Sequence, residues 1–174
     1  MLTIRTLGDK VLTQKAKRVA SVDDTIRTFC VSMINTMIEN NGVGLAANQV
    51  GVLKRIIIVL IDDKPSVMIN PEIVEFSKEF SLMDEGCLSI PDIRGEVLRP
   101  ETIEIEYYDE NFNLKRSMFD GIISRVIQHE YDHIEGKLFT DKLSSFKRKI
   151  IEKKLMKISK GNINTSYSMK FFKK

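Results

Sequence analysis

The chain has 174 residues, of which 43% are hydrophobic and 29% are charged, and this suits one domain with a single core. The longest unbroken apolar run, Ile56 to Ile61, is far shorter than the ~18 residues that a membrane-spanning helix needs. These features exclude a membrane-spanning protein. The sequence also has no internal repeats and no low-complexity segment ahead of its last residues.

The charge is distributed unevenly along the chain. The net charge is +3, but residues 137–174 carry twelve Lys or Arg against Asp141 and Glu152, a net of +10, which leaves −7 for residues 1–136. A basic C-terminal region predicts either contact with an anionic surface, such as the ribosome or a nucleic acid, or a solvated helix face with a disordered tail.

The N-terminus and the cysteines indicate the cellular compartment of the protein. The first nine residues lack the apolar segment of a secretory signal. The two cysteines, Cys30 and Cys87, lie in such different contexts that no disulfide framework is expected. We therefore expect a cytoplasmic protein.

The predicted elements begin with a helix over 23–39, where apolar residues recur at helical spacing behind an aspartate N-cap. Cys30 belongs to this apolar face and is most simply a small core residue. The glycine-rich segment 42–49 is expected to be a loop or short strand. The β-branched run 55–61 predicts a buried strand.

Further strands are predicted after this run. Segment 67–76 is interrupted by Pro71, so we expect a bend or a sheet edge there. Residues 102–107 alternate apolar and polar side chains, and with 112–119 they predict a hairpin. Helices at both ends with strands between them predict an α+β fold: one domain with mixed or antiparallel sheets around a central helix that carries the motif described next.

Both histidines of the chain lie in one run, His129-Glu130-Tyr131-Asp132-His133. Residues four apart share one face of a helix, so both imidazoles can reach a single metal ion. Glu130 is then placed to accept the proton of a water that the metal activates. The alternative is a polar helix that carries this string by chance.

The motif helix is predicted to begin at the N-cap Asp120 and to end at Gly136. Ile122 and Val126 continue the histidine face, which would place an apolar surface beside the metal for a substrate side chain. Ordinary core packing explains the same spacing. A last helix is predicted to begin at Ser144 or Ser145. Its buried stripe is predicted to consist of Phe146, Ile150, Leu155 and Ile158.

A catalytic metal usually takes three protein ligands, so a third is needed. The candidates are a downstream carboxylate, Glu152, and a thiolate. Cys87 is the better ligand because it follows a glycine that permits close backbone approach, and because its neighbours are polar. One thiolate with two imidazoles suits a borderline metal in tetrahedral geometry, and softness alone favours zinc.

Three motifs of this chain resemble, in order and spacing, those of the peptide deformylase family: Gly42-Val43-Gly44-Leu45-Ala46-Ala47-Asn48-Gln49, Glu85-Gly86-Cys87-Leu88-Ser89, and His129-Glu130-Tyr131-Asp132-His133. The resemblance runs from about Leu7 to Leu143. It implies a catalytic domain over residues 1–160, followed by a basic tail over 161–174 for which disorder is one expectation. The implied reaction removes the formyl group from the N-terminal N-formylmethionine of nascent polypeptides and releases formate.

The resemblance also implies roles for residues in the site. The implied metal ligands are Cys87, His129 and His133. Fe2+ is the implied metal in the cell, with Zn2+ or Ni2+ able to replace it in purified protein. Glu130 is the implied general base. The side-chain amide of Gln49 and the backbone N–H of Leu88 are implied to meet the charge that develops on the formyl oxygen.

The substrate is then a formylated nascent peptide, lying as an added strand along the first motif. The backbone groups of Val43, Gly44 and Leu45 are predicted to bind it, together with Ile122 and Val126. Arg94 matches a family arginine near the peptide path, although a surface arginine explains it nearly as well. Asp132 and Arg99 are expected to form an ion pair.

Two rival functions remain open from the sequence. One is an endopeptidase that uses Glu152 as the third ligand, which the cysteine motif and the short chain disfavour. The other is a basic ribosome- or RNA-binding protein with a structural metal. Structural sites are closed by four ligands, and no fourth ligand lies near these three in the sequence.

Overall fold

The computed structural model describes residues 1–171. The helices are α1 (Asp24–Glu39), α2 (Gly121–Ile134) and α3 (Ser145–Ser159), with 3-10 turns at Lys10–Thr13, Ala47–Val50 and Phe139–Lys142. The strands are β1 (Ile4–Arg5), β2 (Gly44–Ala46), β3 (Ile56–Ile61), β4 (Lys64–Phe76), β5 (Phe80–Cys87), β6 (Ile90–Pro100), β7 (Ile103–Tyr108), β8 (Leu114–Phe119) and β9 (Met169–Lys170).

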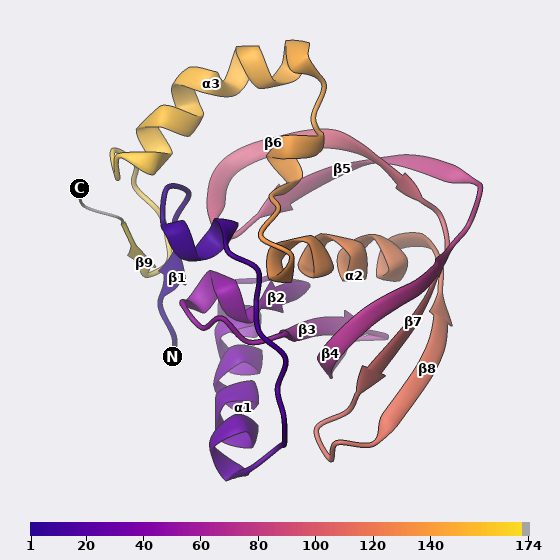
Figure 1. Ribbon diagram of the computed structural model, residues 1–174. Coiled ribbons are helices and arrows are strands. Elements are labelled where there is room, and N and C mark those ends of the chain that lie inside the picture. Colours follow the sequence, from indigo (N-terminus) through magenta and orange to yellow (C-terminus); the bar gives the residue numbers. More distant parts are fainter. Residues whose placement is uncertain (172–174) are drawn as a thin grey trace.

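The strands form three sheets around α2. A five-stranded antiparallel sheet has the order β2-β3-β4-β7-β8, β5 pairs with β6 in a long hairpin, and β1 pairs in parallel with β9. Figure 1 shows α2 across the middle of the molecule, with β5 and β6 on one side and β2 and β3 on the other. The helices α1 and α3 lie at opposite ends. The predicted α+β class is confirmed.

The β-branched run in β3 is buried on both faces, which explains why it is continuously apolar. Ile56 and Ile58 point into a core cluster shared with α1, whereas Ile57 and Val59 point into a second cluster beneath α2. Because side chains alternate along a strand, β3 joins the two clusters. A third cluster lies between β6 and α3, and it includes Ile151.

Several predicted elements are confirmed. The helix α1 begins after Asp23, whose side chain accepts a 2.8 Å hydrogen bond from the Ile26 N–H. The expected bend at Pro71 is a register shift in β4, next to Asn70, which has a positive φ of 51°. The predicted hairpin is formed by β7 and β8.

The ends of α2 differ in detail from the prediction. Asp120 occupies the N-cap position, but its side chain makes no capping hydrogen bond. The C-cap is Glu135, and Gly136 follows it with a φ of 74°. A glycine just beyond the C-cap is common, because that position takes the left-handed conformation.

The predicted buried stripe of α3 is partly wrong. Ser144 caps the helix as expected, but Phe146 and Ile150 are 75% and 60% exposed. The helix is held by Ile151 and Ile158, with Leu155 half-buried between them. Successive helical residues are about 100° apart, so a step of five from position 150 to 155 moves to another face. The predicted stripe therefore mixed two faces of α3.

The β5–β6 hairpin and the pairing of β9 with β1 were not predicted from the sequence. Met169 pairs with Ile4, and Lys170 pairs with Arg5, so the C-terminal segment returns to the N-terminal strand. Of the predicted tail over 161–174, residues 172–174 lie outside the described residues. No helix within residues 1–171 is long and apolar enough to cross a membrane.

Candidate metal centre

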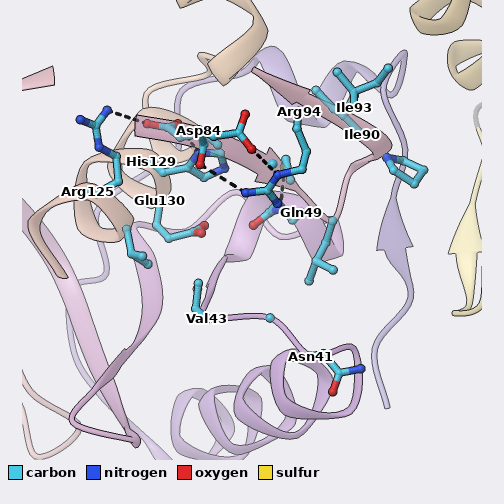
Figure 2. Close-up of a pocket in the computed structure, with 18 of the residues that line it drawn as sticks. Asn41, Val43, Gln49, Asp84, Ile90, Ile93, Arg94, Arg125, His129 and Glu130 are labelled. Carbon is cyan, nitrogen blue, oxygen red and sulfur yellow. Dashed lines mark hydrogen bonds and ion pairs between the residues drawn. The ribbon is translucent and has the colours of Figure 1, made fainter. Parts of the chain in front are cut away.

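A pocket of about 490 Å3 opens where α2 meets β2 and the β5–β6 hairpin. Its walls come from residues 41–44 and Gln49, from residues 84–88 and 90–94, from one face of α2, and from Tyr167 near the C-terminus. Figure 2 shows Val43, Gln49, Arg94 and Glu130 around this space. The three sequence motifs, far apart in the chain, therefore meet at one pocket.

Three potential metal ligands converge beside the pocket, which Cys87 and His129 line. The ligand atoms of Cys87, His129 and His133 all lie within 4.8 Å of one another, and Cys87 Sγ is 3.3 Å from His133 Nε2. Within residues 1–171, this is the one cluster of three or more such side chains. Glu152 is exposed on α3, and Cys30 is buried in the core beneath α1.

The donor set fits a divalent metal. Metal–sulfur and metal–nitrogen bonds of about 2.0–2.3 Å place tetrahedral ligand atoms about 3.5 Å apart, close to the spacing of Cys87 and His133. The site also favours positive charge. Burial lowers the pKa of His129, but its hydrogen bonds with Cys87 and Glu85 outweigh burial and raise that pKa to about 10. The groups around His129 therefore favour a positive charge at this position, and a bound metal cation would supply that charge in place of the proton.

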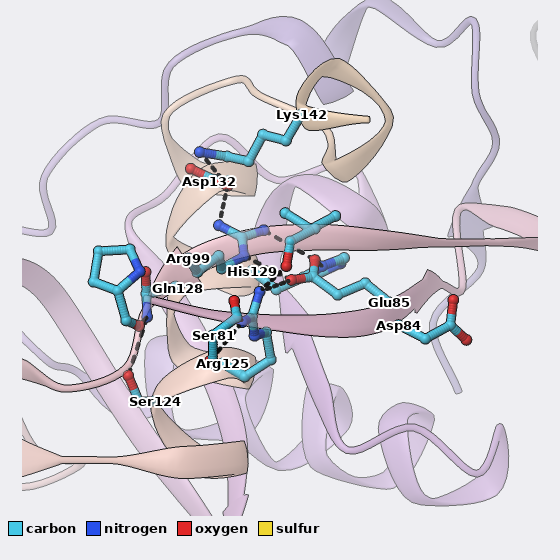
Figure 3. Close-up of polar contacts among 12 residues, drawn as sticks. Ser81, Asp84, Glu85, Arg99, Ser124, Arg125, Gln128, His129, Asp132 and Lys142 are labelled. Atoms are coloured by element: carbon cyan, nitrogen blue, oxygen red, sulfur yellow. Dashed lines mark hydrogen bonds and ion pairs between the residues drawn. The ribbon is translucent and has the colours of Figure 1, made fainter. Parts of the chain in front are cut away.

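The orientation of His129 is set by Glu85. Glu85 Oε2 lies 2.9 Å from Nδ1 of His129, which leaves Nε2 for the ligand cluster. Arg99 donates to both carboxylate oxygens of Glu85 at 2.7 and 3.0 Å, and Arg125 donates to Oε1 at 3.0 Å (Figure 3). Burial would raise the pKa of Glu85, but the hydrogen bonds from His129 and Arg99 hold it well below its usual range. Glu85 is thus a fixed anion.

The same arginine reaches the helix that carries the histidines. Arg99 Nη1 donates to Asp132 Oδ2 at 2.6 Å, which confirms the predicted ion pair. Both side chains are buried, so the pair links β6 rigidly to α2. Burial lowers the pKa of His133 well below its usual value, so this imidazole is neutral and can act as a ligand.

Glu130 is buried beside the ligand cluster, with 4% of its surface exposed. Its Oε2 has no hydrogen-bond partner within the described residues, and Figure 2 shows the carboxylate directed into the pocket. Burial raises the pKa of Glu130 to about 7. The backbone of β2 packs directly on this carboxylate: a Cβ at Gly44 would lie 2.5 Å from Glu130 Oε1. A carboxylate in this state can exchange protons near neutral pH.

Gln49 contacts the ligand Cys87, and Leu88 follows Cys87 in the chain. Gln49 Oε1 accepts a 2.8 Å hydrogen bond from the Ala46 N–H, which leaves its Nε2 to donate toward Cys87 Sγ and Ser89 Oγ, each at 3.4 Å. Leu88 lies in the turn between β5 and β6 and lines the pocket. The amide of Gln49 therefore presents donors to the site.

Four of the five predicted substrate-binding residues line the pocket: Val43, Gly44, Ile122 and Val126. The side chain of Leu45 is fully buried in the core beneath α1, so any contribution of this residue to substrate binding is through its backbone, as predicted for residues 43–45. The strand β2 is at the edge of its sheet, so its outer side is open. Arg94 lines the pocket and donates to Asp84 at 2.5 Å.

Sequence reasoning missed three residues that shape the site. Glu85 and Arg125 carried a signal, because polar residues close to a ligand in the sequence often orient it: Glu85 is two residues before Cys87, and Arg125 is four residues before His129. Tyr167 carried none: it lies 79 residues from Leu88, yet its hydroxyl donates to the Leu88 carbonyl at 2.7 Å. Burial and the nearby Cys87 raise the pKa of Tyr167 to about 12, so this hydroxyl stays protonated.

Two histidines four apart on a helix, a thiolate and a buried carboxylate at an open pocket define a metal-dependent hydrolase. The family model described as "Polypeptide deformylase" matches residues 1–149. The chain belongs to this family.

Individual relatives agree with the family match. The peptide deformylase of Picosynechococcus sp. is 49% identical over 149 residues, covering 83% of this chain and 80% of the relative. That of Christiangramia forsetii is 43% identical over 188 residues, covering 98% and 96%. The crystal structure of a peptide deformylase from Synechococcus elongatus in complex with actinonin has a TM-score of 0.84 and 42% identity, covering 88% of this chain and 85% of that one.

The activity of this chain is accordingly that of a peptide deformylase. It hydrolyses a linear amide and removes the formyl group from the N-terminal formylmethionine of nascent polypeptides.

Proposed function

We propose that Cys87, His129 and His133 hold the divalent metal with which this chain carries out deformylation. The observation that carries this proposal is the convergence of the three ligand atoms beside the buried carboxylate of Glu130. Three protein ligands leave a position open for substrate or water, which is typical of a catalytic rather than a structural metal site.

The metal and Glu130 are proposed to have different roles in the reaction. A divalent metal supplies Lewis acidity, which polarises a carbonyl and makes water acidic enough to attack near neutral pH. Glu130 accepts the proton of the attacking water at its carboxylate and later delivers it to the leaving amine. Its lack of other hydrogen-bond partners in the described chain keeps the carboxylate free for this transfer.

The developing charge on the formyl oxygen is met by two donors, the Gln49 Nε2 amide and the Leu88 backbone N–H. Gln49 is suited to this role because the Ala46 N–H holds its carbonyl oxygen and so fixes which end faces the site. A donor of this kind is worth about 10²–10³ in rate, since it needs no reorganisation during the reaction.

The substrate peptide is proposed to lie along the open edge of β2. In the antiparallel pairing with β3, Val43 accepts from Leu60, so alternate residues such as Gly44 turn their backbone groups outward. Ile122 and Val126 then supply an apolar wall for the methionine side chain. The side chain of Leu45 instead supports this strand from the core.

The ligand assignment is tested by two matched cysteine variants. Cys87→Ser should lose bound metal and formate release, whereas Cys30→Ser should retain both, because Cys30 is a buried core residue. Metal content per chain and formate release from a formyl-Met peptide are the measurements. Loss of metal in Glu152→Ala, with full metal in Cys87→Ser, would instead support the endopeptidase alternative.

We propose Fe2+ as the metal in the cell, with Zn2+ or Ni2+ able to occupy the same ligands. The mixed sulfur and nitrogen set accepts all three, so metal supply decides which is bound. Elemental analysis of protein purified anaerobically from its own cells tests this. Stoichiometric iron is expected, and stoichiometric zinc under those conditions would contradict it.

We also propose that the protein is cytoplasmic and that α3 brings it to the ribosome, where formylated chains emerge. The helix exposes Lys153, Lys154 and Lys157 to solvent. Contact of these cations with RNA phosphates should weaken steeply as salt is raised. Phe146 and Ile150 are exposed on the same helix and add apolar surface.

Charge reversal tests the ribosome contact without unfolding α3. Lys153→Glu with Lys154→Glu should reduce co-sedimentation with ribosomes at low salt and leave formyl-peptide hydrolysis unchanged. Lys64→Glu with Lys78→Glu, at exposed positions outside α3, is the matched control and should retain co-sedimentation. Equal co-sedimentation of both double variants across a salt series would rule out this role.

A further inference from the structure

The C-terminal segment of the chain returns to the active site. Tyr167 follows α3, lines the pocket, and donates its hydroxyl to the Leu88 carbonyl at 2.7 Å. Its ring packs against the core cluster beneath α1, which Leu88 also contacts. The family match ends at residue 149, so this contact comes from beyond the matched segment.

The turn between β5 and β6 is held at two successive carbonyls. The Leu88 carbonyl accepts from Tyr167, and the Ser89 carbonyl accepts from the Leu7 N–H at 2.9 Å. The same N-terminal segment anchors the C-terminal one: the Thr6 N–H and Oγ1 donate to the Lys170 carbonyl at 3.2 and 2.7 Å. The two termini therefore clamp this turn together.

The clamped turn carries two groups of the proposed site. Cys87 pairs with Ile90 across the turn, after a register shift that follows Gly86, so the strand ladder does not set the orientation of the residues between them. Because peptide groups are planar, fixing the Leu88 carbonyl restricts the rotations that orient the neighbouring peptide groups. These include the N–H of Leu88 and the backbone of Cys87.

We infer that Tyr167 is a positioning residue of the deformylase site: its hydroxyl fixes the Cys87–Leu88 turn and thereby aims the Leu88 N–H at the developing charge. This inference rests on the proposed role of Leu88. Tyr167 does not touch the reacting atoms in this role; it acts through the backbone of the turn.

The test removes the hydroxyl and keeps the ring. Tyr167→Phe should lower kcat for a formyl-Met peptide by about tenfold, since a hydrogen bond that positions a catalytic donor is lost. KM and metal content should stay close to those of the unmodified protein, whereas thermal stability should fall modestly because the Leu88 carbonyl loses its donor. Tyr108→Phe is the matched control, because Tyr108 packs against the same cluster but does not line the pocket, and it should leave kcat unchanged.

A second variant separates the hydroxyl from the ring. Tyr167→Leu also lacks the hydroxyl and should show at least the same loss of kcat. Normal kcat in Tyr167→Phe, with a loss only in Tyr167→Leu, would overturn the inference, because the ring would then be the important part. Lower metal content in Tyr167→Phe with normal kcat per bound metal would overturn it as well.

The failure of this inference can be told apart from the failure of the proposed site. Loading the protein with Co2+ gives a thiolate-to-metal absorption band if Cys87 is a ligand, independently of turnover. Absence of that band in the unmodified protein would contradict the proposed ligands. Its presence in both the unmodified protein and Tyr167→Phe, together with equal kcat values, would contradict the role of Tyr167 alone.

Discussion

Glu85 and His129 form a buried contact of 2.9 Å between Oε2 and Nδ1, and this contact decides which nitrogen of His129 faces Cys87. The glutamate is held in turn by Arg99 from the neighbouring strand β6. The position of the proposed ligand therefore depends on charges in the hairpin as well as on α2.

Glu85→Gln should weaken metal binding by about 10–100-fold, because the partner that orients a ligating histidine is changed. The variant should also be less stable, since the buried Arg99 and Arg125 lose their shared carboxylate. Competition with a chelator, at a temperature where the variant is folded, measures the affinity. Glu96→Gln, at an exposed position on β6, is the control. Unchanged affinity in Glu85→Gln would show that α2 alone orients His129.

Gly44→Ala should lower kcat by more than tenfold with the metal retained. The added methyl group would lie 2.5 Å from Glu130 Oε1 and 2.8 Å from Val126 Cγ1, so the carboxylate or the strand must move. A shift of about 1 Å in a reacting group can cost 10²-fold in rate. Formate release and metal content of the variant are the measurements, and full activity would mean that the position of Glu130 against β2 is unimportant.

The buried face of α3 is tested by neighbouring isoleucines. Ile151→Ala should destabilise the protein by about 2–4 kcal/mol, because it leaves a cavity beside β6. Ile150→Ala should cost less than about 0.5 kcal/mol, since this side chain is 60% exposed. Denaturant unfolding of both variants provides the comparison. Equal destabilisation would place both residues in the core.

The iron form is expected to lose activity in air. Ferrous iron and the thiolate of Cys87 are both open to oxidation, and the sulfur is only half-buried at the pocket. Activity should decay aerobically in the iron form and persist in the nickel or zinc form. Stable activity of a verified iron form over days in air would contradict this expectation.

Local patterns were sufficient to predict α1, β3 and the β7–β8 hairpin. The spacing of apolar residues in these elements shows which face is buried, or, in β3, that both faces are buried. The grouping of the ligand cluster was predictable for the same reason: a spacing of four on a helix fixes two of its members. The β5–β6 hairpin was not, since its residues alternate weakly and include charged side chains that become buried only against α2.

Long-range contacts were beyond local patterns. Nothing near Tyr167 indicates that it returns to Leu88, because the contact depends on how β9 pairs with β1. The buried face of α3 was predicted wrongly for a related reason. The helix has apolar residues on two faces, and which face is buried depends on how the helix packs against β6.

The most direct test of the account is the effect of Glu130→Gln on metal-loaded protein. The amide keeps the size of the side chain but cannot accept a proton, so the variant should fold and bind metal normally. Its rate of formate release from a formyl-Met peptide should fall by about 10²–10⁴-fold. A Glu130→Gln protein with a full complement of metal and a near-normal rate would contradict the proton-transfer role of Glu130 and the site built around it.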